Sequence, residues 1–233
     1  MTETPILVGS TNRGKVAEIR RALASLPVAL RTLDDLAIRV RAPEAGSNFL
    51  ENARAKSLFY SRRTDLLTLA EDSGLEVDGL GGAPGVRSAR FAGPGATDER
   101  NIRKLLGLLK DMPPSKRRAR FVCCMVLSRR GRVLKEVTGL VRGTISLEKR
   151  GKGGFGYDPV FWYAPLRRRF AELSAEDKNR ISHRGRTLHK LAAYLASHPE
   201  VLAARPGRAA GTPARGEGGT PPPVTSRRLR CRP

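Results

Sequence analysis

The chain has 233 residues, of which 44 are Lys or Arg and 22 are Asp or Glu, so its formal net charge is +22. Its length suits one domain or two small ones, and 39% apolar with 28% charged residues is typical of a water-soluble globular protein. No apolar run approaches the roughly 20 residues that a membrane-spanning helix needs, and the N-terminus lacks the basic leader of a secretory signal. With only three cysteines, two of them adjacent, we expect a cytoplasmic protein without disulfides.

The last thirty residues differ in composition from the rest. Residues 204–233 contain seven Arg and one Glu together with six Pro and five Gly, and they show no apolar period. This composition predicts a disordered basic tail after a folded domain at residues 1–203. The tail could contact nucleic acid non-specifically, because clustered Arg attracts any polyanion.

The first half of the chain predicts strands that alternate with helices. Strands are expected at 6–8, at 28–33 and at 66–70, where the apolar run LLTLA stops before Glu71. Helices are expected at 14–25 and from an N-cap at Ser47 to about Arg62.

The second half adds a long hairpin. A helix from the cap Thr97 to Leu109 precedes two long strands, 119–128 and 132–146, joined by a turn. A glycine-rich loop at 151–159, a short strand at 160–162 and helices at 175–181 and 183–197 complete the chain. Alternating strands and helices combined with a hairpin predict an α/β fold with a mixed sheet.

Two segments of the first half carry candidate chemistry. The turn from Ser10 to Lys15 opens a helix, where free backbone N–H groups and a lysine could bind phosphate; an ordinary capped helix start is the alternative. Adjacent Glu71 and Asp72 could hold Mg²⁺ and orient a water, or could simply mark the polar end of a strand. Upstream, Asn52 and Lys56 share one helix face, which could also be a solvated surface.

The glycine-rich loop and the final helices carry further candidates. The sequence GGFGYDP combines permissive glycines with aromatic rings that could stack on a nucleobase, or that could pack into the core. Cations and hydrogen-bond donors gather between Asp177 and Gly185, around His183. No Cys or His pattern has zinc-ligand spacing, and no serine-hydrolase motif is present.

Taken in order, the segments STNRGK, FLENARAK, EDSGLEVDGLGGAPG, GKGGFGYDP and ISHRG resemble the inosine triphosphate pyrophosphatase family, also called XTP/dITP diphosphatases. The resemblance covers roughly residues 5–197. It implies an elongated mixed sheet with flanking helices, in two lobes around a central nucleotide-binding cleft, and a homodimer. It also implies Mg²⁺-dependent hydrolysis of ITP, dITP and XTP to the monophosphate and pyrophosphate.

The resemblance assigns roles to individual residues. Asp72 corresponds to the family's proton acceptor, and Glu44 and Asp72 correspond to its metal ligands. The substrate-binding positions correspond to Ser10, Thr11, Asn12, Arg13, Gly14, Lys15, Lys56, Ser73, Phe155, Gly156, Tyr157, Asp158, Lys178, His183 and Arg184.

Three positions depart from the family pattern. Glu71 stands where Asp is usual, which leaves its part in metal binding open; Thr11 replaces a common Gly; and Arg87 replaces an aromatic residue. Two other functions stay open. A basic nucleic-acid-binding protein without catalysis is disfavoured by 5% aromatic residues and by the absence of a recognisable motif, and a pyrophosphatase of modified pyrimidine nucleotides would share the same chemistry.

Overall fold

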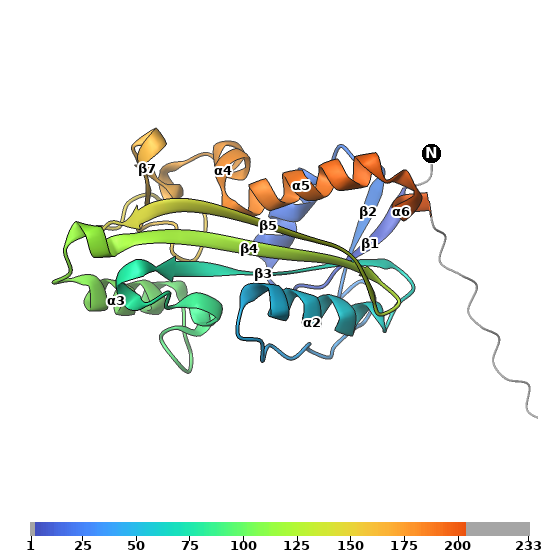
Figure 1. Ribbon diagram of the computed structural model, residues 1–233, viewed down its shortest axis with the longest axis horizontal. Coiled ribbons are helices and arrows are strands. Elements are labelled where there is room, and N and C mark those ends of the chain that lie inside the picture. Colours follow the sequence, from blue (N-terminus) through green and yellow to red (C-terminus); the bar gives the residue numbers. More distant parts are fainter. Residues whose placement is uncertain (1–2, 204–233) are drawn as a thin grey trace, which may run out of the picture.

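A seven-stranded mixed sheet runs through the molecule in the order β2-β1-β3-β4-β5-β6-β7. The computed structural model describes residues 3–203 (Figure 1). The strands are β1 (Thr4–Val8), β2 (Val28–Thr32), β3 (Leu67–Val77), β4 (Arg118–Arg129), β5 (Arg132–Ile145), β6 (Phe161–Tyr163) and β7 (Arg168–Arg169). β1 pairs in parallel with β2 and β3, and every later pair is antiparallel. The predicted α/β fold with a mixed sheet is confirmed.

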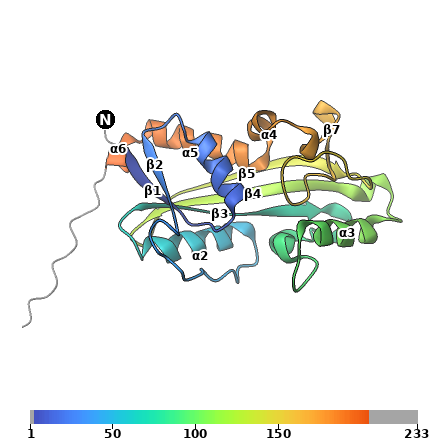
Figure 2. The ribbon, with the colours of Figure 1, turned by 180° about the vertical axis from the view of Figure 1, so that it is seen from behind.

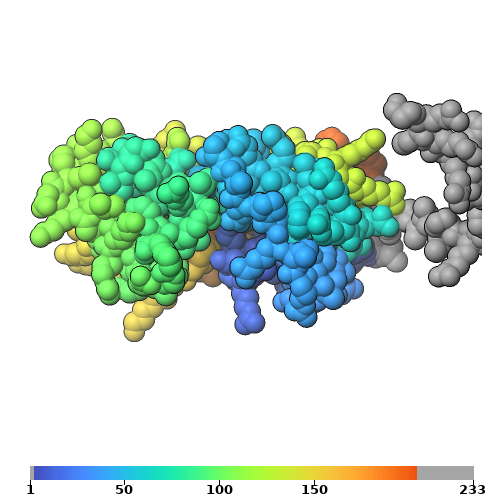
Figure 3. Space-filling view, turned by 90° about the horizontal axis from the view of Figure 1, so that it is seen from below, coloured from blue at the N-terminus to red at the C-terminus, as the bar shows by residue number. Residues whose placement is uncertain are grey.

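Helices cover both faces of this sheet, as the views from front and behind show (Figures 1 and 2). They are α1 (Arg13–Ala22), α2 (Phe49–Ser61), α3 (Asp98–Leu109), α4 (Ala175–Ile181), α5 (His183–Ser197) and α6 (Pro199–Ala203). α2 and α3 lie one after the other below the sheet in Figure 1, and their residues form part of the surface seen from below in Figure 3, whereas α4 and α5 lie on the opposite face. None of the helices in residues 3–203 is long and apolar enough to cross a membrane.

The two largest apolar core clusters of residues 3–203 lie at opposite ends of the long strands β3, β4 and β5. These strands follow the long axis of the molecule (Figure 1). At one end, apolar residues of α1 and α5 pack against β1, β3 and β4. At the other end, α3 packs with β6 and the far ends of the long strands. Adjacent Cys123 and Cys124 belong to different core clusters, and both thiols are free, because neighbours on a strand face opposite sides.

The structure corrects the predicted end of the third strand. β3 continues from Leu67 to Val77 because β4 pairs with it along ten positions, from Thr68 opposite Ser128 to Val77 opposite Ala119. Glu71 and Asp72 are therefore in the middle of a strand. The element that does end beside them is β1, whose last partner on β3 is Leu69.

Two smaller expectations were also wrong, and one short helix was not expected. The N-cap of α2 is Asn48 rather than Ser47, since the Asn48 side chain accepts from the backbone N–H of Glu51. α1 ends at Ala22, three residues early, and Pro27 disfavours helical backbone at the residue before it. The short helix α6 had no clear signal in the sequence.

Candidate active site

Two adjoining cavities form a cleft where β1 ends. The first, which we call the acid cavity, has a volume of about 450 Å³ and is lined by Glu44, Glu71 and Asp72 among others. The second, the aromatic cavity, has a volume of about 110 Å³ and is lined by Phe155, Tyr157 and His183 among others. Both are lined by Asn12, Lys15, Ser73 and Ala89, so they form one continuous cleft.

The turn after β1 lies at the junction of the two cavities. The Asn12 side chain caps α1 by accepting from the backbone N–H of Lys15 at 3.1 Å, and Ser10 Oγ accepts from the backbone N–H of Asn12. Of the predicted phosphate-binding residues, Ser10, Thr11, Asn12 and Lys15 line the acid cavity. Arg13 and Gly14 line neither cavity. A Cβ atom at Gly14 would contact the ring of Phe155 at 3.3 Å, so this glycine allows the glycine-rich loop that carries Phe155 to approach α1 closely.

Lys56 connects the two predicted metal ligands. Its Nζ lies 2.9 Å from Glu44 Oε1 and 3.0 Å from Asp72 Oδ1, and Asn52 Nδ2 donates to the other Asp72 oxygen at 3.1 Å. Burial would lower the pKa of Lys56, but the two carboxylates outweigh it and raise that pKa. The interpretation of this helix face as a solvated surface is wrong for Asn52 and Lys56, because both are buried.

The same pair of carboxylates fits Mg²⁺. Within residues 3–203 no cluster of three or more Asp, Glu, His or Cys side chains could hold a metal. Mg²⁺, however, is commonly bound through one or two carboxylates plus substrate phosphates and water. Glu44 and Asp72 both line the acid cavity and already bind one cation between them, the Lys56 ammonium. Together they would supply the protein ligands of such an ion.

Glu71 has different partners from Asp72. Its carboxylate pairs with Lys15 Nζ at 2.8 Å and with Arg184 Nε at 2.8 Å, and it is 2% exposed. Burial would raise the pKa of Glu71, but Arg184 and Lys15 outweigh burial and hold that pKa well below its usual range. This carboxylate also accepts from the Ser73 hydroxyl and the Cys123 thiol. Its two basic partners pair with neither Glu44 nor Asp72 among the described residues.

The aromatic cavity is lined by buried polar groups. Lys178 Nζ lies 2.6 Å from Asp158 Oδ2, and Arg184 Nη2 donates to Ser73 Oγ at 3.0 Å. The cations of Lys178 and Arg184 lie over the Phe155 ring, 4.8 and 5.4 Å from its centroid. The structure thus brings together residues that the sequence places in three separate segments.

The side chains of His183 and Tyr157 are also held in place in the wall of the aromatic cavity. The His183 ring stacks on Phe121, 4.7 Å between centroids, and its Nδ1 is buried without a hydrogen-bond partner. Burial and the neighbouring Arg184 lower the pKa of His183 well below its usual range, so the ring is neutral at pH 7. Tyr157 is buried, and its hydroxyl donates to the Ser88 carbonyl at 2.8 Å. Gly156 also lines this cavity.

Sequence reasoning missed several lining or bridging side chains. Glu18, one turn after Lys15 on α1, contacts both Lys178 and Arg184, and that spacing could have revealed it. Arg41 and Arg90 line the acid cavity, but their segments have no distinctive residue spacing. Arg87 is exposed and lines neither cavity, so the structure places it away from the cleft.

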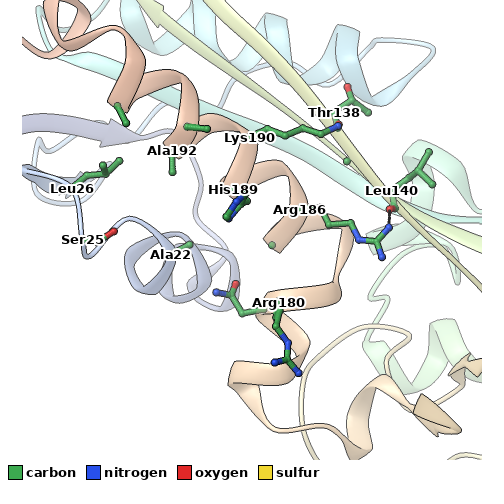
Figure 4. Close-up of a pocket in the computed structure, with 15 residues that line it drawn as sticks. Ala22, Ser25, Leu26, Thr138, Leu140, Arg180, Arg186, His189, Lys190 and Ala192 are labelled. Carbon is green, nitrogen blue, oxygen red and sulfur yellow. Dashed lines mark hydrogen bonds between the residues drawn. The ribbon is translucent and has the colours of Figure 1, made fainter. Parts of the chain in front are cut away.

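A larger cavity lies elsewhere, between α1, β5 and the pair α4–α5 (Figure 4). Its volume is about 970 Å³, and it is lined by small and apolar side chains with Arg180, Arg186, His189 and Lys190. Arg186 and Lys190 donate to backbone carbonyls of β5. Since no carboxylate and none of the predicted site residues line this cavity, the acid and aromatic cavities remain the candidate active site.

Comparison with known proteins places these features in a family. The Ham1 family model matches residues 6–194. The chain is 46% identical over 200 residues to a dITP/XTP pyrophosphatase of Nitrosomonas europaea, covering 84% of this chain and 96% of the relative. It is 42% identical over 190 residues to a dITP/XTP pyrophosphatase of Bacillus licheniformis, covering 82% and 97%.

Solved structures of similar proteins have the same fold. A HAM1 protein from Coxiella burnetii superposes with a TM-score of 0.77 at 38% identity, covering 83% of this chain and 99% of that one. A nucleoside-triphosphatase, also named dITP/XTP pyrophosphatase, from Mycobacterium abscessus superposes with a TM-score of 0.67 at 41% identity, covering 81% of this chain and 98% of that one. The resemblance inferred from five ordered motifs is confirmed: this chain belongs to the Ham1 family.

Proposed function

We propose that this protein hydrolyses non-standard purine nucleoside triphosphates, namely ITP, dITP and XTP, to the monophosphate and pyrophosphate, and so removes them from the nucleotide pool. The curated relatives bear the name dITP/XTP pyrophosphatase. The observation that carries the proposal is the continuous cleft, in which a cavity with carboxylates and cations adjoins a cavity with an aromatic ring and buried donors. The first suits a triphosphate and the second suits a purine base.

In the acid cavity, Asp72 is the proposed proton acceptor. Lys56 and Asn52 each bind one of its carboxylate oxygens, which fixes the side chain toward the cavity. Water would attack the α-phosphorus, Asp72 would take the water proton, and the bond from α-phosphorus to the bridging oxygen would break to release pyrophosphate. Lys15, together with Ser10, Thr11 and Asn12 of the turn, would bind the phosphates.

We further propose Mg²⁺ as the cofactor, held by Glu44 and Asp72. Bound there, the ion would neutralise phosphate charge that the protein's own cations leave unpaired. Lys56, displaced from the two carboxylates, would then be free to turn to a phosphate oxygen.

We propose that the aromatic cavity selects the nucleobase of the substrate. Phe155 would stack on the base, and Arg184 or the neutral His183 would donate to the 6-oxo group. ATP carries an amino group at that position, which would leave these buried donors unpaired. Ser73, Gly156, Tyr157, Asp158 and Lys178 would complete the nucleotide pocket.

The test is pyrophosphate release from ITP, XTP, dITP, GTP and ATP measured in parallel, with and without Mg²⁺. We expect kcat/KM for ITP and XTP to exceed that for ATP by about 10² or more, because a lost buried hydrogen bond discriminates strongly. Equal efficiency on ATP and ITP would identify a general nucleotide phosphohydrolase. Activity confined to modified pyrimidine nucleotides would favour the related pyrophosphatase instead.

The proposal extends to the organisation of the protein. We propose a catalytic domain at residues 1–203 and a separate basic tail at 204–233, which lies outside the described residues and could contact nucleic acid. A cytoplasmic location is consistent with the free thiols of Cys123 and Cys124. A homodimer, which the family resemblance implies, is tested by light scattering of the purified chain.

A further inference from the structure

Each carboxylate that lines the acid cavity is paired with a cation of the same cavity. Glu71 pairs with Lys15, and Asp72 pairs with Lys56. Glu44 has two such partners: its Oε1 lies 2.9 Å from Lys56 Nζ and its Oε2 lies 3.3 Å from Arg90 Nη1. Arg90 is the partner to which neither the sequence motifs nor the proposed mechanism gives a role.

The backbone that carries Arg90 is held in place from several directions. It ends a 3₁₀ helix, Gly85–Arg90, whose Ser88 hydroxyl accepts from the Leu75 N–H of β3 at 2.9 Å. The flanking backbone is fixed by Asn101 of α3, which donates to the Ala89 carbonyl and accepts from the Ala92 N–H at 2.7 Å. The base of the Arg90 side chain therefore has a defined position on the cleft wall.

The guanidinium, in contrast, is free to change partners. The side chains of Arg90 and Glu44 are 50% and 40% exposed, respectively, so water screens their attraction. A divalent cation on Glu44 would compete directly with Arg90 for the same carboxylate. The planar guanidinium can then bind two phosphate oxygens at once, which is the geometry in which arginine binds phosphate best.

The charge of the cavity supports such an exchange. Its lining includes four cations, Lys15, Arg41, Lys56 and Arg90, against three carboxylates. A triphosphate brings about four negative charges and one divalent ion returns two. Without Arg90 the occupied cavity would hold one more uncompensated negative charge.

We propose that Arg90 is a phosphate-binding residue of this site, which leaves Glu44 and binds the pyrophosphate portion of the substrate when a divalent cation occupies Glu44. The inference rests on the proposed function for the identity of the substrate. Its experimental test, however, needs only the pyrophosphate group.

The test compares full-length wild type, Arg90→Ala, Arg90→Lys and Arg87→Ala. Arg87 lies on the same 3₁₀ helix, is exposed and lines neither cavity. Arg87→Ala therefore removes one arginine from the same segment without changing the cleft, and serves as the control. Calorimetry with inorganic pyrophosphate in Mg²⁺ should show Kd raised at least tenfold by Arg90→Ala, less by Arg90→Lys, and less than twofold by Arg87→Ala. In EDTA, where Glu44 keeps Arg90, the effect of Arg90→Ala should be much smaller.

A second readout separates phosphate binding from a structural role. Mn²⁺ affinity without phosphate should be unchanged or tighter in Arg90→Ala, because Glu44 loses a competing cation, and thermal unfolding should stay close to wild type. Equal pyrophosphate affinity in Arg90→Ala and Arg87→Ala, parallel loss of metal and pyrophosphate binding, or no pyrophosphate binding by the wild type would each overturn the proposal. If ITP is not hydrolysed but the pyrophosphate difference persists, the proposed function fails while the role of Arg90 stands.

Discussion

Glu71 and Asp72 are consecutive residues of β3, yet their carboxylates contact different cations from different helices. Glu71 pairs with Lys15 of α1 and Arg184 of α5, whereas Asp72 pairs with Lys56 of α2. This division follows from the strand itself, because successive side chains point to opposite faces. Two adjacent acids that suggest a single metal site in the sequence therefore have separate roles: Glu71 ties two helices to the sheet, and Asp72 faces the proposed reaction.

The first prediction concerns Glu71. Glu71→Gln keeps the shape of the side chain but leaves the fully buried Arg184 guanidinium with Glu18 as its one carboxylate partner, so the free energy of unfolding should fall by about 2 kcal/mol or more. Urea denaturation measures the change. Glu76→Gln, on the same strand but in a partly exposed pair with Arg120, should cost less than about 1 kcal/mol. Similar losses in the two variants would contradict a structural role for Glu71.

The second prediction concerns Asp72. Asp72→Asn removes a proposed metal-ligand charge and the proposed proton acceptor, so kcat for ITP should fall by about 10³ or more. Circular dichroism should show an unchanged fold, because the amide keeps the shape of the carboxylate. The control is Asp78→Asn, whose carboxylate is exposed and pairs with Arg118 at the surface, and which should keep wild-type activity. Substantial turnover by a folded Asp72→Asn protein would remove Asp72 from the mechanism.

Most of the fold and most of the residues that line the cleft could be predicted from the sequence, because the signals for them come from residues that are close together in the chain. Apolar runs, caps such as Thr97 and ordered motifs are all carried by neighbouring residues. The length of β3 was missed because pairing with β4 is non-local and holds Glu71 and Asp72 in extended backbone. Arg90 was missed for the same reason: only the folded chain places it beside Glu44, 46 residues away.

A third prediction follows from the tight junction between α4 and α5. A Cβ atom at Gly185 would lie 1.5 Å from the Asn179 carbonyl oxygen, so Gly185→Ala must push the two helices apart. Since Arg184 precedes it, we expect a loss of about 1–3 kcal/mol in stability and weaker ITP binding. Gly107, inside α3, has open space around it, and Gly107→Ala should stabilise the protein by up to about 1 kcal/mol. Thermal unfolding of both variants is the measurement.

A fourth prediction concerns pH. Because burial lowers the pKa of His183 in the folded state, the unfolded chain binds a proton near pH 6.5 that the folded chain does not. The contribution of the neutral His183 to the free energy of unfolding is therefore present above pH 6.5 and is lost as pH falls below it, by roughly 1 kcal/mol between pH 7.5 and 5.5. His183→Gln should flatten this part of the profile in urea denaturation. An unchanged slope in His183→Gln would contradict the assignment.

The last prediction tests the proposed boundary between the domain and its tail. Every motif of the cleft lies before Ala203, and the end of α6 is attached to the sheet because Thr4 Oγ1 donates to the Leu202 carbonyl at 3.0 Å. Truncation after Arg205 should therefore leave kcat/KM for ITP unchanged. Loss of six of the tail's seven arginines should weaken binding to RNA, most visibly at low salt, since contacts to phosphate weaken steeply as salt rises. The measurement compares full-length and truncated protein for ITP turnover and for RNA binding across a salt series. Lost turnover in a truncation that still unfolds cooperatively would show that residues beyond 205 complete the site, and the boundary would then have to move toward the C-terminus.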